Sequence, residues 1–192
     1  MKNDDELLET IHADEDLADL LAEVCEFDVS RAKHDEPERL SSGKALESVA
    51  GDFSGGTFFR CGPPGSTRPV LYASSEGQAG IIAGSLAEAV ETMAGLPAWR
   101  DCLAYSADGD LAAMRSAAEK LARDEREKWP DVAEKRVELL RALAVTPPPV
   151  PELLARLRDA VAGTAPDFVL VDEAGEEYGT LFGEWSLDRK PL

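Results

Sequence analysis

The central stretch of the chain, residues 45–103, alternates short apolar runs with turn residues more densely than any other part. Three runs rich in β-branched and aromatic residues, at 46–50, 57–61 and 69–73, predict strands. The links between them, GDFSGG and GPPGSTR, are short and rich in glycine, which favours antiparallel hairpins over the long crossovers that parallel strands need. A fourth strand is expected at about 80–83.

A helix is predicted to follow this sheet. Ser85 and Glu88 form the S-x-x-E pattern of a capping box, and apolar residues then recur at helical spacing. Gly95 and Pro97 predict the end of the helix, and a short packing segment is expected after them.

Helical periodicity also dominates both flanks of the sheet. Residues 6–27 predict one amphipathic helix, or two short ones broken near Asp14, and 28–44 predict mostly loop. Residues 109–128 and 131–145 predict two helices that meet at Trp129-Pro130, which we interpret as an antiparallel helical hairpin.

The end of the chain begins with the proline-rich run TPPPVP, residues 146–151. Such a run is typical of a stiff spacer and, less often, of a PxxP ligand for an aromatic groove, so we interpret it as a linker. A helix follows, and 168–171 and 178–182 flank DEAGEE as a predicted β-hairpin. One helix and one hairpin are marginal in isolation, so this tail should pack on the main body or on a partner.

Together these elements predict an α+β protein, with a small antiparallel sheet packed against helices, an added helical hairpin, and a C-terminal helix plus β-hairpin. Its 192 residues and 44% apolar content suffice for one core. We expect an α+β domain over 1–146 and an extension over 147–192.

The charge is strongly acidic and unevenly distributed. The formal net charge is −18, and residues 1–40 carry 14 acidic and 4 basic residues, so this segment supplies −10 of the total. Such a field repels nucleic acid and anionic lipid, so neither is an expected partner. The acidity favours a protein partner with a basic surface, with plain solubility as the alternative.

The cysteines and the hydropathy pattern predict the compartment. Cys25, Cys61 and Cys102 are far apart and odd in number, which favours buried thiols over disulfides. The acidic first residues show no signal peptide, and no apolar run is long enough to span a membrane. We expect a cytoplasmic protein.

A search for catalytic chemistry is negative. GDFSGG resembles the GDSGG around a serine-protease nucleophile, but Phe53 interrupts it, so a hairpin turn is favoured. The chain has only two histidines, His12 and His34, and a hydrolase would need one of them beside Ser54. No metal-ligand spacing and no phosphate loop are present. We therefore predict a binding protein without a cofactor rather than an enzyme.

The central stretch resembles the SUKH superfamily, small α+β proteins that often serve as immunity proteins in bacterial toxin systems and that include regulators of cell-wall synthesis. The resemblance covers about residues 45–105. It lies in LESVA, the turn of Gly51-Asp52 with Gly55-Gly56, the strands Thr57-Phe58-Phe59 and Pro69-Val70-Leu71-Tyr72, and the Ser85-initiated helix. The family's early Leu-Pro with aromatic residues has no counterpart here.

The resemblance implies a binding role: neutralisation of a toxin by occlusion of its active site. On this hypothesis the partner contacts are expected among Asp52, Phe53, Tyr72 and Glu76. The alternative is a regulatory or scaffold domain that uses the tail. Deletion of 147–192 is expected to separate the two, because an immunity core would keep its partner.

Overall fold

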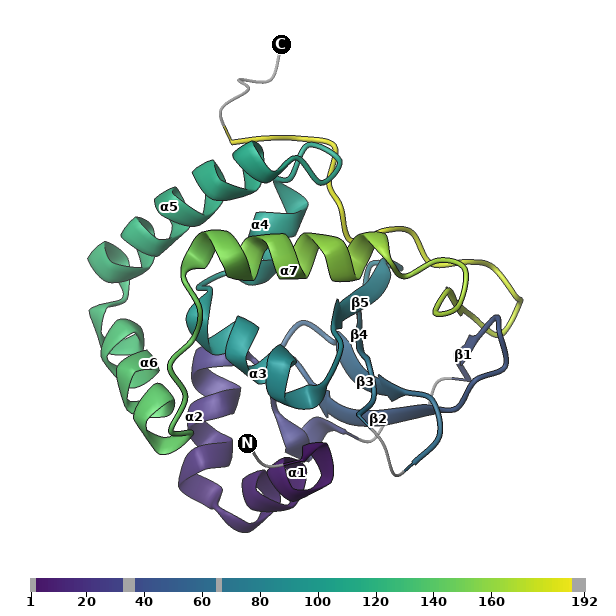
Figure 1. Ribbon diagram of the computed structural model, residues 1–192, viewed down its shortest axis with the longest axis horizontal. Helices are drawn as coiled ribbons and strands as arrows, with labels where there is room; N and C mark the ends of the chain where they lie inside the picture. The colour runs from purple at the N-terminus through teal and green to yellow at the C-terminus, as the bar shows by residue number, and fades with distance from the viewer. Residues whose placement is uncertain (1–2, 33–36, 65–66, 188–192) are drawn as a thin grey trace.

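The computed structural model describes residues 3–32, 37–64 and 67–187, and it confirms the predicted α+β class (Figure 1). In this part of the chain the elements are seven α-helices, one short 3₁₀-helix and six strands in two antiparallel sheets. The helices are α1 (Asp4–Ala13), α2 (Glu15–Cys25), α3 (Leu86–Gly95), α4 (Trp99–Ala104), α5 (Leu111–Lys128), α6 (Pro130–Ala142) and α7 (Val150–Ala162), and η1 spans Val29–Arg31. The strands are β1 (Arg39–Leu40), β2 (Leu46–Gly51), β3 (Thr57–Cys61), β4 (Val70–Ala73), β5 (Ala79–Ala83) and β6 (Leu170–Val171).

The main sheet has the order β2-β3-β4-β5, so each strand pairs with its neighbour in sequence, as the glycine-rich links predict. Both faces of the sheet are buried. Phe58 of β3 points into the larger core beneath the helices, whereas the adjacent Phe59 joins a smaller core with Leu40 of β1 and Leu170 of β6. This alternation follows from the two-residue period of a strand.

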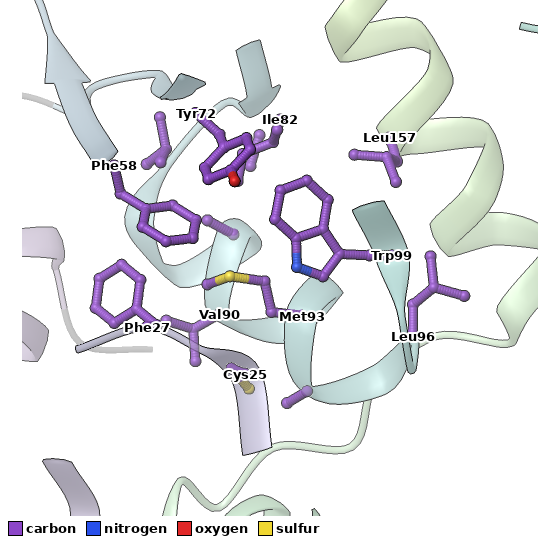
Figure 2. Packing of buried hydrophobic residues seen from close by; sticks show 14 of the residues in the cluster. Cys25, Phe27, Phe58, Tyr72, Ile82, Val90, Met93, Leu96, Trp99 and Leu157 are labelled. Atoms are coloured by element: carbon purple, nitrogen blue, oxygen red, sulfur yellow. The ribbon is translucent and has the colours of Figure 1, made fainter. Parts of the chain in front are cut away.

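The larger core lies between the main sheet and the helices (Figure 2). Phe27, Phe58, Tyr72 and Trp99 gather there, with ring centroids 5.1 Å apart for Phe27–Phe58 and 5.2 Å apart for Tyr72–Trp99. The tilted and edge-on arrangements of these rings are the favourable ones for aromatic pairs. The three cysteines are free and buried, as predicted.

The N-terminal segment forms two helices rather than one. Asp14 is extended and ends α1, and its side chain accepts a 3.1 Å hydrogen bond from the Leu17 backbone N–H at the start of α2. The predicted break near Asp14 is therefore confirmed. It exists because an aspartate cap satisfies an N–H group that the first turn of a helix leaves unpaired.

The helix after the sheet begins where the sequence predicts. Ser85 caps α3 by accepting a 3.1 Å hydrogen bond from the Glu88 N–H. The Glu88 carboxylate accepts a hydrogen bond from the Gly84 N–H, whereas in a standard capping box it would accept one from the Ser85 N–H. The capping box is therefore shifted by one residue. The helix ends at Gly95, and the expected short packing segment is α4.

The two helices α5 and α6 are present, but their arrangement differs from the predicted antiparallel hairpin. In Figure 1 they follow one another around the outside of the molecule, and α6 packs mainly on α2. Trp129 is the single residue between them. This connection is shorter than usual for two helices that reverse side by side.

Arg136 of α6 joins three helices. Its guanidinium donates to the carbonyl oxygens of Met93 and Ala94 in the last turn of α3, at 3.0 and 3.2 Å, and to that of Val24 in α2, at 3.4 Å. Its partner on α5 is Glu125, with an N–O distance of 2.7 Å. A cation at two helix C-termini is favourable because it satisfies unpaired carbonyl groups and complements both helix dipoles.

The tail packs on the body of the same chain. After the proline run, α7 crosses the molecule between α5 and the sheet (Figure 1), and Leu153, Leu154 and Leu157 lie fully buried in the larger core. A Cβ atom at Gly95 would lie only 2.7 Å from Cβ of Pro147, so the linker also touches α3 closely. The hydrophobic core is thus continuous across the expected boundary at residue 146.

The predicted C-terminal hairpin forms only in part. The chain reverses over DEAGEE, where Tyr178 N–H donates to the Leu170 carbonyl at 3.0 Å. Its first arm, β6, pairs with β1, which falls in a segment predicted to be loop. The second arm is not a strand, and Gly179 instead makes a parallel bridge with Gln78. The local hairpin is thus reduced to the antiparallel bridge between Val171 and Glu177, and pairing with distant segments extends it.

Candidate functional site

The turn between β2 and β3 is organised by Asp52, which is 1% exposed. One carboxylate oxygen, Oδ1, accepts 2.8 Å hydrogen bonds from the Ser54 N–H, the Ser54 hydroxyl and the Gly56 N–H. An aspartate that bonds to its own following backbone is a common way to fix a turn. GDFSGG is therefore a hairpin connection, as predicted.

The second carboxylate oxygen of Asp52 connects the turn to the core. Oδ2 accepts a 2.7 Å hydrogen bond from the Tyr72 hydroxyl on β4 and an ion-paired hydrogen bond from Arg100 on α4. The other end of Arg100 pairs with Glu26, which ends α2 in a left-handed conformation with φ of 52°. The turn, β4 and α4 thus meet at one buried carboxylate, and Arg100 extends the network to the end of α2.

The electrostatics keep Asp52 ionised and Tyr72 protonated. Burial alone would raise the pKa of Asp52, but hydrogen bonds from Tyr72, Ser54 and Gly56, together with the charge of Arg100, lower this pKa below its usual value. Burial and the bond to Asp52 raise the pKa of Tyr72 to about 12. A tyrosine in this state is neither a base nor a nucleophile at neutral pH, so the network positions the turn.

Phe53 sits next to Asp52 in sequence but points outward, with 58% of its surface exposed. The Arg31 guanidinium lies 5.1 Å from the centre of its ring. Arg31 is held in turn by Asp28, with a 3.0 Å N–O distance, and Asp28 pairs through its backbone with Gly51. The Phe53 ring therefore lies against Arg31, which is held beside the turn by Asp28.

Glu76 lies exposed on the neighbouring turn between β4 and β5. This turn and Gly55 form one side of a cleft of about 420 Å³, and the reversal at 172–178 forms the other. Among the described residues, four carboxylates and no Lys or Arg line the cleft; the acids are Glu38, Asp172, Glu176 and Glu177. We call this hollow the acidic cleft.

The hydrogen bonds around the acidic cleft hold its walls in place. Tyr178 donates to Glu38 at 3.0 Å, and Asp172 accepts from the Glu176 N–H at 2.8 Å. Arg39 donates at 2.9 Å to the carbonyl oxygen of Asp172, not to a lining carboxylate. The acidic side chains of the cleft are therefore held on walls that hydrogen bonds fix in place.

The four residues predicted to contact a partner thus divide into two kinds. Asp52 and Tyr72 are buried, 1% and 3% exposed, and bond to one another. Phe53 and Glu76 are exposed on adjacent turns. The buried pair offers no surface, so its role is to position Phe53.

Sequence reasoning missed Arg100, Glu26 and the residues of the acidic cleft. Arg100 is 48 positions from Asp52 and Glu26 is 74 positions from Arg100, so no local spacing links them. The acidic cleft likewise combines residues far apart in the sequence, from the loop before β1, the two turns of the main sheet and the tail. The density of acidic residues in DEAGEE is the sequence feature that relates to the cleft, and on its own it predicts only a hairpin turn.

Within the described part of the chain, no catalytic constellation forms around Ser54. Its hydroxyl donates to Asp52, and in the described ranges no hydrogen bond joins it to a histidine. His12 lies exposed in the last turn of α1, and His34 lies outside the described residues.

The described residues form neither a metal cluster nor a membrane-spanning helix. Among residues 3–32, 37–64 and 67–187, no group of three or more His, Cys, Asp or Glu could hold a metal ion. No helix in these ranges is long and apolar enough to cross a membrane. The acids of the cleft therefore do not converge on one cation.

Comparisons with protein-family models, with curated proteins and with solved structures find no match to this chain.

Proposed function

We propose that the protein is a non-enzymatic binding module that neutralises a basic protein, in the manner of a toxin immunity protein. The observation that carries the proposal is the firmly held, exposed Phe53 beside the acidic cleft. The two features share the Asp52–Gly56 turn, because Gly55 lines the cleft two residues after Phe53.

Phe53 suits the role of an anchor. Interfaces gain most of their free energy from a few large side chains, and a side chain that is already ordered loses less entropy on binding. The Asp52 hydrogen bonds and the Arg31 contact provide this order before a partner arrives. A hydrophobic pocket on the partner would cover the ring.

The acidic cleft suits a lysine or arginine of the same partner. Its four carboxylates lie in a concave site, where water is reduced and charge attraction is stronger than on an open surface. The net charge of −18 extends this attraction to longer range and speeds the encounter with a basic surface. An active site that binds polyanions, as in a nuclease, has the complementary charge.

Deletion of 147–192 cannot separate the immunity hypothesis from the scaffold alternative, because it would remove α7, which forms part of the core. Removal of Leu153, Leu154 and Leu157 would expose the sheet and unfold the body. Surface variants separate the immunity hypothesis from the scaffold alternative instead.

The experiment uses the protein partner that co-purifies with the full chain from a native lysate, with affinity measured by calorimetry and protection from that partner measured by growth on co-expression. Phe53→Ala is compared with Trp129→Ala, which removes an aromatic residue of equal exposure, 58%, from a distant corner. We expect Phe53→Ala to weaken binding by about 2 kcal/mol or more, which is roughly thirtyfold, and Trp129→Ala to leave it unchanged.

The cleft is tested by the double variant Glu176→Gln, Glu177→Gln. Its matched control is Glu134→Gln, Glu138→Gln, which removes two exposed charges from α6. We expect slower association only for the cleft variant. Equal effects of both pairs would reject the cleft as the contact, and binding without protection from the toxin would favour the scaffold alternative.

A further inference from the structure

A second hollow, far in sequence from the Asp52 turn, lies among the helices. It measures about 700 Å³ and runs between α1 and α2, the outer face of α3, and the segment 142–146 that leaves α6. Apolar side chains make most of its lining, including Leu7, Leu17, Val90, Leu143 and Val145. We call it the helical groove. None of its lining residues lines the acidic cleft.

The polar groups at the helical groove already have partners within the chain. The Thr10 hydroxyl donates to the Glu6 carbonyl at 2.7 Å. Arg156, a basic residue of the lining, donates to Glu91 at 3.2 Å and to Glu152 at 2.5 Å. A small polar ligand would find few groups to orient it, whereas an apolar surface would fit without displacing these bonds.

The two helices that flank the groove are rich in acidic residues. The segment from Asp4 to Cys25, which forms α1, Asp14 and α2, contains nine acidic residues and no Lys or Arg, although Asp4 is buried and Asp5 and Glu23 are paired with basic side chains. Glu88 and Glu91 add charge on the α3 side, and Glu91 is paired with Arg156. An apolar floor beside acid-rich helices is complementary to a segment with one apolar face and basic flanks.

We propose that the helical groove binds a basic amphipathic helix of a partner protein. Such a helix would place apolar residues at i, i+3, i+4 and i+7 against the half-buried Leu7, Leu143 and Val145, as in other helix-in-groove complexes. Its lysines or arginines would face the acids of α1 and α2. The inference does not depend on the Phe53 surface.

The probe is a fluorescein-labelled peptide of about 15 residues, four helical turns, with leucines at helical spacing and lysines elsewhere. Anisotropy is measured on the full chain. The first control peptide has the same composition with the leucines scattered around the helix, and the second replaces every lysine by glutamate. We expect the amphipathic lysine peptide to bind at least about tenfold tighter than either control.

The protein variants locate the site. Ala87 lines the helical groove and is half-buried, so Ala87→Leu should fill it and weaken peptide binding about tenfold. Ala112→Leu makes the same change on an exposed position of α5 and should have no effect. Thr146→Leu, at an exposed lining position, provides a second test that is independent of the α3 backbone. Circular dichroism verifies that each variant is folded.

Equal binding of the scattered peptide would overturn the proposal, because it would show a charge effect without a groove. Unchanged binding by both Ala87→Leu and Thr146→Leu would do the same. A concentration-dependent dimer that these variants abolish would assign the groove to a second copy of the chain. Phe53→Ala should not alter peptide binding, so failure here and failure of the proposed function are distinguishable.

Discussion

The substitution Asp52→Asn tests whether the ionised carboxylate holds the turn in place. The amide oxygen can still accept the three bonds from Ser54 and Gly56, but the amide nitrogen cannot accept from Tyr72 or Arg100. Each hydrogen bond to a charged group contributes about 1.5–3 kcal/mol. Arg100 keeps its bond to Glu26, and its side chain is 29% exposed, so water compensates part of the loss.

We therefore expect Asp52→Asn to lower the free energy of unfolding by about 3 kcal/mol at neutral pH. For a chain of this size such a loss corresponds to a melting temperature lower by about 6–12 °C. Urea denaturation followed by tryptophan fluorescence measures it. Tyr72→Phe, which removes one donor, should cost about 1 kcal/mol, and the double variant should cost less than the sum.

The pH dependence gives a sharper test. The folded-state pKa of Asp52 lies below its unfolded value of about 3.9, so the unfolded state binds the proton more readily. The stabilisation is then complete above the unfolded pKa and is lost as the pH falls through the folded pKa. The difference between wild type and Asp52→Asn should shrink as the pH falls below the unfolded value of about 3.9 and on through the lower folded pKa. An equal difference at neutral and acid pH would refute the reasoning.

Two further substitutions test the packing of the helices. Arg136→Met leaves three carbonyl groups and the half-buried Glu125 without their donor, and should cost about 3 kcal/mol in urea unfolding. Lys135→Met, on the same helix with an exposed partner, should leave the midpoint nearly unchanged, and equal losses would contradict the capping role. Gly95→Ala forces a methyl group against Pro147 and should cost about 1–3 kcal/mol. It should also speed hydrogen exchange in α7, and unchanged protection there would show that the linker contact is unimportant.

The elements that the sequence predicts well are those defined by neighbours in the chain. The β3 strand has the predicted bounds, and Ser85 caps α3 as expected, because side-chain alternation and a cap that bonds three residues ahead are local effects. The hairpin order of β2 to β5 follows for the same reason, since links of a few residues leave no other pairing.

The predictions that needed correction involve contacts between distant segments. β6 pairs with β1 across about 130 positions in addition to its local bridge from Val171 to Glu177, and α6 packs mainly on α2 with fewer contacts to α5. In both places several partners satisfy the local pattern equally. The choice depends on which apolar face each element can bury, and the periodicity of one segment does not contain that information.

The candidate site shows the same division. The sequence alone determined that Asp52 begins a tight turn, that Phe53 interrupts a protease-like motif, and that the chain is strongly acidic. Only the tertiary structure decided that Asp52 and Tyr72 are buried, that Arg100 and Glu26 complete their network, and that the tail forms a wall of the acidic cleft. Burial and charge pairing arise where segments far apart in the chain meet, so the fold had to be known before they could be assigned.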